Sequence, residues 1–368
     1  MAGAFGGPNT YIQRGGEIRK LATHVAPIGK RAVVVMDRAV EASLSSDLRD
    51  DFDKQGIEAR FATFGGECTT GEIDRIGRLA RDCGSQVLIG VGGGKTADTV
   101  KSAAVAVDAR IVIVPTIASS DAPCSAITVR YSPNGVFEES VNLPRHPDLV
   151  LVDTDIVVQA PARFLVAGIG DALSTWFEAR SNMESRSKNY VAGGFPPTRA
   201  GIAVACECHE VLMRDAVLAT MAVEKKLFTT AVDNIIEANI LLSGLGFENV
   251  GCSAAHGIHD GLTVLDETHG FLHGEKVAFG TLCLLMLESR PIEEIEAMIR
   301  FCRSVGLPTT LGDLNIRDVS RSAIERVAVA ALAPGESTFA TPVALTVPLV
   351  TDAIIALDAF AQRIAVSA

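Results

Sequence analysis

The sequence predicts an α/β dinucleotide-binding domain over residues 1–160, followed by an all-helical domain over residues 161–368. Two observations support this fold class. Up to about residue 160, short runs rich in valine and isoleucine alternate with segments of helical periodicity, a pattern typical of a mostly parallel sheet with crossover helices. Beyond Pro161, alanine and leucine dominate and β-branched runs become rare. We therefore expect the active site in a cleft between the two domains.

Five strands of the parallel sheet are expected in the first domain. Each is a short apolar run bounded by turn residues or by a helix-periodic segment. They cover residues 32–36, 59–64, 86–91, 110–115 and 149–152. A further pair of strands is expected to flank Ser132-Pro133-Asn134-Gly135, whose composition favours a hairpin turn.

Helices are expected where apolar residues recur at helical spacing. In the first domain they cover residues 70–83 and 95–107, the second of which directly follows a run of glycines. Pro161 is suited to the start of a helix. The longest helical segments of the second domain are expected at residues 200–213, 216–245 and 291–305.

The composition excludes several classes of partner. The chain has 33 Lys plus Arg against 44 Asp plus Glu, a net charge of −11, and only one Trp and three Tyr. Nucleic-acid binding is therefore not expected. No stretch of about 18 residues is apolar throughout, which argues against a membrane span. The N-terminus lacks the pattern of a signal peptide, so we expect a cytoplasmic protein with reduced cysteines.

A glycine turn is the first candidate functional motif. The strand expected at 86–91 runs into Gly92-Gly93-Gly94, and a helix then opens with Lys95. Glycines let a phosphate approach the backbone, and a helix N-terminus favours negative charge. Gly92, Gly94 and Ala97 match the G-x-G-x-x-A dinucleotide fingerprint, although the acidic residue expected about 20 residues later is missing. The alternative is a turn that only permits close packing of helix and sheet.

Asp37 supplies an acidic residue elsewhere, at the end of the first strand, AVVVMD. Its carboxylate could accept hydrogen bonds from an adenosine ribose and would repel a 2′-phosphate, which favours NAD over NADP. The alternative is a loop residue that caps the next helix.

A candidate metal centre lies in the second half of the chain. Asp171 is expected inside an otherwise apolar helix, where an unpaired carboxylate is costly. Four histidines, at 256, 259, 269 and 273, fall within a short stretch flanked by small residues. Two imidazoles and one carboxylate form a common catalytic zinc set, because three protein ligands leave a position for water or substrate. The alternative is a group of histidines satisfied by ordinary hydrogen bonds.

Five blocks of the sequence resemble the iron-containing alcohol dehydrogenase and dehydroquinate synthase superfamily, and within it the glycerol dehydrogenase branch. They are GGGKTADTVK (92–101), PTIASSDAPCSA (115–126), GDALSTWFEA (170–179), AAHGIH (254–259) and HGEKVAFGTL (273–282). The blocks occur in the same order and span nearly the whole chain. The resemblance implies an NAD-binding domain, a helical domain, a zinc ion between them, and a homo-oligomer, which in this family is an octamer.

The resemblance also implies roles for individual residues. Asp171, His256 and His273 match the metal ligands, whereas His259 and His269 match neighbours of the ligands. Asp121 and Phe247 match positions beside the substrate. The positions that match cofactor contacts are Asp37, Gly93, Gly94, Lys95, Thr96, Asp98, Thr116, Ser119, Ser125, Ile127 and Tyr131.

One departure bears on the metal. Iron-using members of the superfamily resemble this chain at Asp171 but carry a further histidine ligand four residues later, where this chain has Thr175. A three-ligand site favours zinc over iron.

The expected activity is oxidation of glycerol, or of a related vicinal diol such as 1,2-propanediol, by hydride transfer from C2 to the nicotinamide. Dihydroxyacetone and NADH would be the products from glycerol. Asp121 is expected to hold the terminal hydroxyl of the substrate, with a helix N-cap as the alternative. Two other activities stay open: a dehydroquinate-synthase-like lyase, for which the motifs supply few basic residues besides Lys276, and a non-catalytic nucleotide-binding regulator.

Overall fold

The computed structural model describes residues 3–364, which form two compact units. The α/β unit comprises Gly6–Ala162 together with Val223–Phe228. Among the described residues, the helical unit comprises Arg163–Ala222 and residues 229–364, together with residues 3–5. No helix within residues 3–364 is long and apolar enough to cross a membrane.

The α/β unit is built on a six-stranded parallel sheet in the order β1-β8-β5-β4-β2-β3. The strands are β1 (Tyr11–Gln13), β2 (Arg31–Met36), β3 (Glu58–Thr63), β4 (Val87–Gly92), β5 (Arg110–Pro115) and β8 (Leu149–Val152). This confirms the predicted sheet. Strand β1 was not predicted, since it is only three residues long and carries no apolar run; it pairs with the edge of β8.

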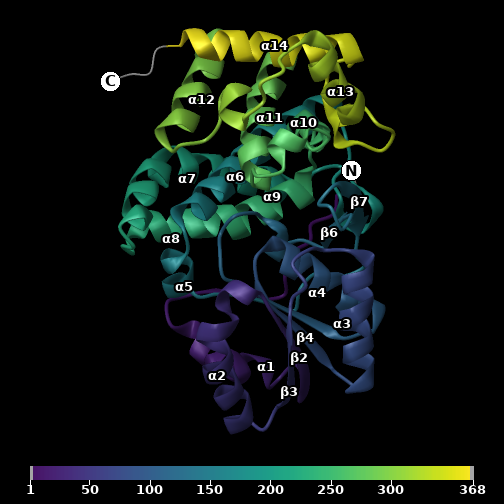
Figure 1. The fold of residues 1–368 in the computed structure, drawn as a ribbon, viewed down its shortest axis with the longest axis vertical. Coiled ribbons are helices and arrows are strands. Elements are labelled where there is room, and N and C mark those ends of the chain that lie inside the picture. The colour runs from purple at the N-terminus through teal and green to yellow at the C-terminus, as the bar shows by residue number, and fades with distance from the viewer. Residues whose placement is uncertain (1–2, 365–368) are drawn as a thin grey trace. The chain divides into compact units, whose positions relative to one another are not determined.

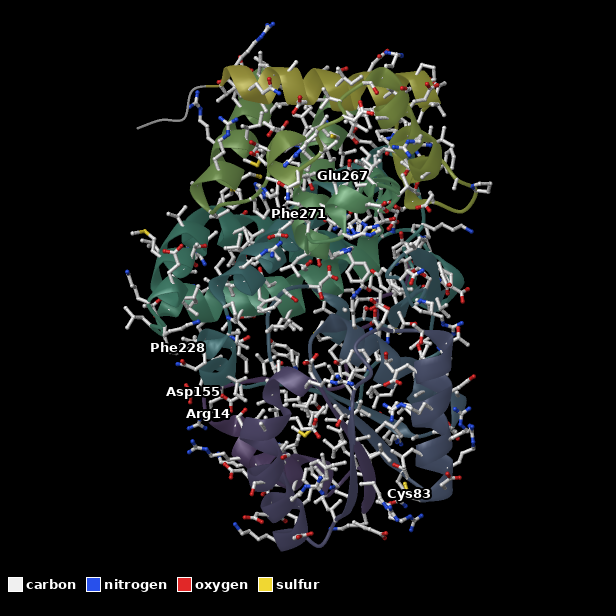
Figure 2. The ribbon with its side chains drawn as sticks, in the orientation of Figure 1. Arg14, Cys83, Asp155, Phe228, Glu267 and Phe271 are labelled. Atoms are coloured by element: carbon white, nitrogen blue, oxygen red, sulfur yellow. The ribbon has the colours of Figure 1, made fainter. Side chains whose placement is uncertain are left out.

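Most helices of the α/β unit connect one strand of the sheet to the next, and the last of them follows the final strand (Figure 1). They are α1 (Leu21–Val25), α2 (Arg38–Lys54), α3 (Thr70–Asp82), α4 (Gly94–Ala106) and α5 (Thr154–Gln159), with short 3-10 turns η1 (Glu17–Lys20) and η2 (Ala122–Cys124). Cys83, labelled in Figure 2, follows the last residue of α3. The predicted hairpin is also present, as β6 (Ile127–Tyr131) paired antiparallel with β7 (Phe137–Asn142).

The second unit is helical throughout the described residues, as predicted. Its helices are α6 (Ala162–Ser185), α7 (Arg199–Glu224), α8 (Thr230–Glu237), α9 (Ser243–Val250), α10 (Ala254–Leu262), α11 (His273–Leu287), α12 (Ile292–Ser304), α13 (Arg321–Ala331) and α14 (Val347–Arg363). A π-helical turn, η4 (Ala238–Leu242), joins α8 to α9, and four 3-10 turns are η3 (Val191–Gly193), η5 (Asp266–Thr268), η6 (Gly312–Leu314) and η7 (Ser337–Ala340).

Two predicted helix boundaries are wrong. Helix α7 continues through Arg214 and Asp215, where a break was expected, and the two side chains pair at 2.9 Å. The break falls instead after Glu224, inside the helix expected at 216–245. There Lys226 adopts the left-handed conformation, and Thr229 caps the start of α8 through the amide of Val232.

Small residues bring three helices of the second unit into close contact. A Cβ atom added at Gly274 of α11 would lie 1.8 Å from the carbonyl oxygen of Ala167 on α6. One added at Gly280 of α11 would lie 2.2 Å from the carbonyl oxygen of Ala255 on α10. Only glycine fits at these crossings, so α11 lies directly against both α6 and α10. Each of these three helices carries one member of the expected metal site.

Candidate metal centre and nucleotide site

The three expected metal ligands converge in the helical unit. Asp171 lies in the middle of α6, His256 in the first turn of α10, and His273 at the first position of α11. Their ligand atoms all lie within 4.8 Å of one another. The Asp171 carboxylate is fully buried, while the two imidazoles stay partly exposed. The group is thus anchored in the helix core and open on the imidazole side.

The spacing of these atoms suits a tetrahedral metal ion. Oδ1 of Asp171 lies 3.2 Å from Nε2 of His273 and 3.6 Å from Nε2 of His256. Two ligands bound tetrahedrally at zinc-like distances lie about 3.4 Å apart. These separations would let one metal ion bind all three atoms with little rearrangement.

Glu178 orients the His256 ring from α6. Its Oε2 lies 2.7 Å from Nδ1 of His256, and its Oε1 accepts the backbone N–H groups of Ser253 at 2.8 Å and His256 at 3.0 Å. The fully buried carboxylate thereby caps the N-terminus of α10 and holds the imidazole with Nε2 toward Asp171. A carboxylate behind a metal-binding histidine is a recurrent arrangement that fixes the tautomer.

His273 is supported differently, through a second histidine. Nδ1 of His273 lies 3.0 Å from Nε2 of His259, and Nδ1 of His259 lies 2.9 Å from Oδ1 of Asp260. His269 is not part of this chain of contacts, since its Nε2 lies 2.9 Å from the carbonyl oxygen of Thr263. Glu267 and Phe271, labelled in Figure 2, lie on the segment that leads from α10 to His273. The structure therefore distinguishes the two histidines that the sequence left as neighbours.

The charges of the group reinforce one another. Burial by itself would raise the pKa of Asp171, but His273 and His256 hold it well below its usual range. Burial would lower the pKa of His256, yet Cys252 and Glu178 beside it raise it well above the ordinary value. Asp171 is therefore ionised, as a metal ligand must be.

A second set of donor atoms shares His256. Glu178, Cys252 and His256 also place possible ligand atoms within 4.8 Å of one another. Here, however, Glu178 and Nδ1 of His256 are joined by a hydrogen bond, which leaves no room for an ion between them. The geometry favours the Asp171 group as the metal site and Glu178 as its support.

The hydroxyl group of Thr175 has a hydrogen-bond partner on another helix. Its Oγ1 lies 2.9 Å from Oγ of Ser243 on α9, and both residues are buried. The position where iron-using relatives are expected to carry a histidine thus contributes to helix packing.

The glycine turn of the α/β unit is tightly enclosed. Gly92 ends β4, Gly93 is the N-cap residue of α4, and Gly94 begins the helix. A Cβ atom at Gly92 would lie 2.6 Å from Oγ1 of Thr96, and one at Gly94 would lie 2.8 Å from Oγ of Ser120. Side chains are excluded from the turn, and the backbone amides at the start of α4 are the groups with which an anion site is expected from the sequence.

Two charged residues beside the turn have protein partners. Nζ of Lys95 lies 2.5 Å from Oε2 of Glu67. Asp98 is buried, accepts the N–H of Val129 and pairs with Nζ of Lys101 at 2.9 Å. If Asp98 contacts the cofactor as expected, it does so while also making these two contacts within the protein.

Lys101 was missed by the sequence analysis. It is fully buried, and its Nζ donates to the carbonyl oxygens of Ala122, Ser125 and Ile127. These bonds fix the loop that carries Asp121. Lysine in a helix usually points to solvent, so burial could not have been read from its position.

Asp37 lies where β2 ends and serves as the N-cap residue of α2, with Oδ1 accepting the N–H of Ala39 at 2.9 Å. The alternative capping role is therefore present, and the second oxygen remains for a ribose. Asp121 is buried at the N-cap position of η2, but its side chain makes no capping hydrogen bond there.

The other expected residues take various places. Phe247 is nearly buried on α9, its ring tilted against Tyr190 in the helical unit. In the α/β unit, Tyr131 lies at the end of β6 with Nζ of Lys95 5.4 Å from its ring centre. The remaining residues lie on the turn, on α4, on the chain between β5 and β6 or at the first position of β6: Gly93, Gly94, Thr96, Thr116, Ser119, Ser125 and Ile127.

Comparisons with known proteins define the class. A family profile described as iron-containing alcohol dehydrogenase matches residues 8–154. The glycerol dehydrogenase of Thermotoga maritima is 46% identical over 356 residues, covering 96% of both chains. The glycolaldehyde reductase of Halobacterium salinarum is 42% identical and covers 99% of both. The crystal structure of a probable glycerol dehydrogenase from Sinorhizobium meliloti superposes with a TM-score of 0.95 at 66% identity, covering 98% of this chain and 99% of that one.

The chain belongs to the iron-containing alcohol dehydrogenase family. It is an enzyme, an oxidoreductase of the alcohol dehydrogenase class. The resemblance to the glycerol dehydrogenase branch is confirmed, since relatives of that name match this chain over nearly its full length.

Proposed function

We propose that this protein oxidises glycerol, or a closely related small vicinal diol, with NAD as hydride acceptor and zinc as the metal. The observation that carries the proposal is the convergence of Asp171, His256 and His273 into one three-ligand group. Relatives that are named glycerol dehydrogenase and share 41% or more of the sequence support the substrate class.

The chain's own residues supply the metal-binding geometry. Asp171 contributes a buried carboxylate, and His256 and His273 contribute Nε2 atoms. A zinc ion held there would act as a Lewis acid toward the oxygen atoms of an alcohol. Thr175 contributes no fourth protein ligand, because its hydroxyl pairs with Ser243. This supports zinc over iron.

The cofactor role falls to the α/β unit. The enclosed glycine turn and the amides that open α4 suit a pyrophosphate. Asp37 is proposed to accept hydrogen bonds from the adenosine ribose through its second oxygen, and its charge favours NAD over NADP. The proposed contacts to NAD are Asp37, Gly93, Gly94, Lys95, Thr96, Asp98, Thr116, Ser119, Ser125, Ile127 and Tyr131.

Two residues are proposed to recognise the substrate. Asp121 would accept a hydrogen bond from a terminal hydroxyl through its buried carboxylate. Phe247 would contribute an apolar surface beside the carbon chain.

A second candidate substrate comes from one relative. The 42% identical protein of Halobacterium salinarum is named glycolaldehyde reductase. Reduction of a two-carbon hydroxyaldehyde uses the same hydride chemistry in the reverse direction, and both compounds present two adjacent oxygens to a metal. The preferred substrate and direction are therefore the finer part of the proposal.

The proposal is tested by NADH formation over a panel of alcohols. Glycerol, 1,2-propanediol, ethylene glycol and 1-propanol are compared with and without a zinc chelator, and zinc or Fe²⁺ is then added back. We expect activity with the diols, little with 1-propanol, loss on chelation and recovery with zinc. Equal activity with 1-propanol, or activity that survives complete removal of metal, would refute the proposal. Conversion of a phosphorylated substrate without net formation of NADH would indicate a lyase. NAD binding without any turnover would indicate a regulatory protein.

The domain boundary near residue 160 and a homo-oligomeric state belong to the same proposal. Helix α7 exposes Val217, Leu218 and Met221, an apolar stretch that favours self-association. Light scattering should give a mass that is a multiple of the 38.7 kDa chain, with an octamer expected from the family.

A further inference from the structure

In each proposed ligand histidine, Nδ1 is the ring nitrogen that faces away from Asp171. The Nδ1 atoms of the two histidines contact different kinds of partner. Behind His256 stands the carboxylate of Glu178, in direct contact. Nδ1 of His273 instead contacts another imidazole, at Nε2 of His259, at 3.0 Å. The His259 and His273 rings meet edge to face, with centroids 4.1 Å apart. His259 itself is buried, so this contact is shielded from water.

The direction of each hydrogen bond follows from metal binding. If Nε2 of His273 binds a metal, its proton must lie on Nδ1, which then donates to Nε2 of His259. An accepting Nε2 places the proton of His259 on Nδ1, and that atom donates to Oδ1 of Asp260 at 2.9 Å. One tautomer of His259 therefore satisfies both contacts.

Asp260 in turn has a partner on another segment of the helical unit. Its carboxylate is hydrogen-bonded to Glu336 at the start of η7. Burial and the nearby charge of Asp260 raise the pKa of Glu336 to about 8, so Glu336 carries a proton at neutral pH. Glu336 donates this proton to Asp260, so the hydrogen bonds that start from His273 and from Glu336 both end on the Asp260 carboxylate.

We propose that His259 is a positioning residue of the metal centre, which fixes the tautomer and ring orientation of His273 and thereby strengthens metal binding. The proposal rests on the metal role of His273 in the proposed function. It concerns metal affinity alone, so it can fail while the diol activity stands.

A purely structural role for His259 would make a different prediction. The side chain of glutamine can place its amide oxygen near the position of Nε2 in histidine, whereas asparagine reaches only the position of Nδ1. His259→Gln thus keeps an acceptor for His273, and His259→Asn keeps a partner for Asp260 without reaching His273. If packing alone mattered, the two amides would be similar.

The test is zinc affinity, measured by competition with a chromophoric chelator on the full-length protein. Wild type is compared with His259→Gln, His259→Asn and the control His269→Ala. The imidazole of His269 contacts the carbonyl oxygen of Thr263 and lies outside the contacts described above. Circular dichroism and thermal unfolding of the metal-free proteins check the fold. Loss of a partner behind a metal ligand typically weakens affinity about 10- to 100-fold.

We expect His259→Asn to bind zinc about 10- to 100-fold more weakly, His259→Gln to lie within about threefold of wild type, and His269→Ala to match wild type. Equal affinities of the asparagine variant and wild type would overturn the proposal, as would equal losses in the asparagine and glutamine variants with intact folds. Failure of the wild type itself to bind zinc would instead refute the proposed metal site, which separates the two conclusions.

Discussion

Replacing Glu178 by glutamine should weaken metal binding without unfolding the protein. Glu178 is fully buried on α6 and accepts three hydrogen bonds, two from backbone amides and one from His256. The amide oxygen of Glu178→Gln can still accept from Ser253 and His256, so the cap on α10 survives. Its NH₂ group, however, faces Nδ1 of His256.

The magnitude follows from that single contact. Two donors cannot face each other, so His256 must move its proton from Nδ1 to Nε2, the atom that a metal needs. The charge-assisted hydrogen bond that is lost contributes about 1.5–3 kcal/mol. At 1.4 kcal/mol for each factor of ten, zinc affinity should fall by roughly 10- to 100-fold.

The assay is chelator competition for zinc, accompanied by thermal unfolding of the metal-free protein. Asp358→Asn is the matched control, because Asp358 is a buried carboxylate on α14 that also accepts a backbone amide, that of Leu311. The control should bind zinc like wild type. Wild-type affinity in Glu178→Gln would refute the reasoning, and so would a loss of affinity that is fully explained by unfolding.

Three further predictions concern other parts of the chain. Asp37→Asn keeps the capping oxygen for Ala39 but removes the charge. The preference of wild type for NAD over NADP, expected to be at least about tenfold, should therefore narrow in steady-state kinetics. An unchanged ratio of the two catalytic efficiencies would assign the preference to other residues. Asp121→Ala should lower kcat/KM for glycerol by about one to two orders of magnitude more than for 1,2-propanediol, because only glycerol has hydroxyls at both ends; equal losses would assign Asp121 to loop structure. Glu336 has a pKa of about 8 in the folded protein against an ordinary 4.5, so its stabilising proton is fully present below 4.5 and is lost as the pH rises toward 8. The Tm of Glu336→Gln should therefore gain on that of wild type as the pH rises through this window, and a constant difference would contradict the shift.

The sequence was a good guide to the fold where periodicity is strong. Strands such as β4 and β5 are continuous apolar runs, which is the usual sequence pattern of buried parallel strands. The helix expected at 216–245 failed because its break depends on one residue, Lys226, in a left-handed conformation, and no glycine or proline marks that position.

The candidate site was only partly visible from the residues. Spacing alone left four histidines open, and the family resemblance selected His256 and His273. Glu178 could have been found, since it lies seven residues after Asp171 and thus two turns along the same face of a helix. Asp260 and Glu336 could not, because their contact joins α10 to η7 and depends on how the chain folds back.

The most direct test of the account is anomalous diffraction from crystals of the protein grown with zinc, with data recorded on both sides of the zinc and iron absorption edges. The account predicts one zinc peak within about 2.3 Å of Asp171 and of Nε2 of both His256 and His273, with Glu178 hydrogen-bonded behind it. A peak between Glu178, Cys252 and His256, an iron signal at the three ligands in protein purified without added metal, or no ordered metal at all would contradict it.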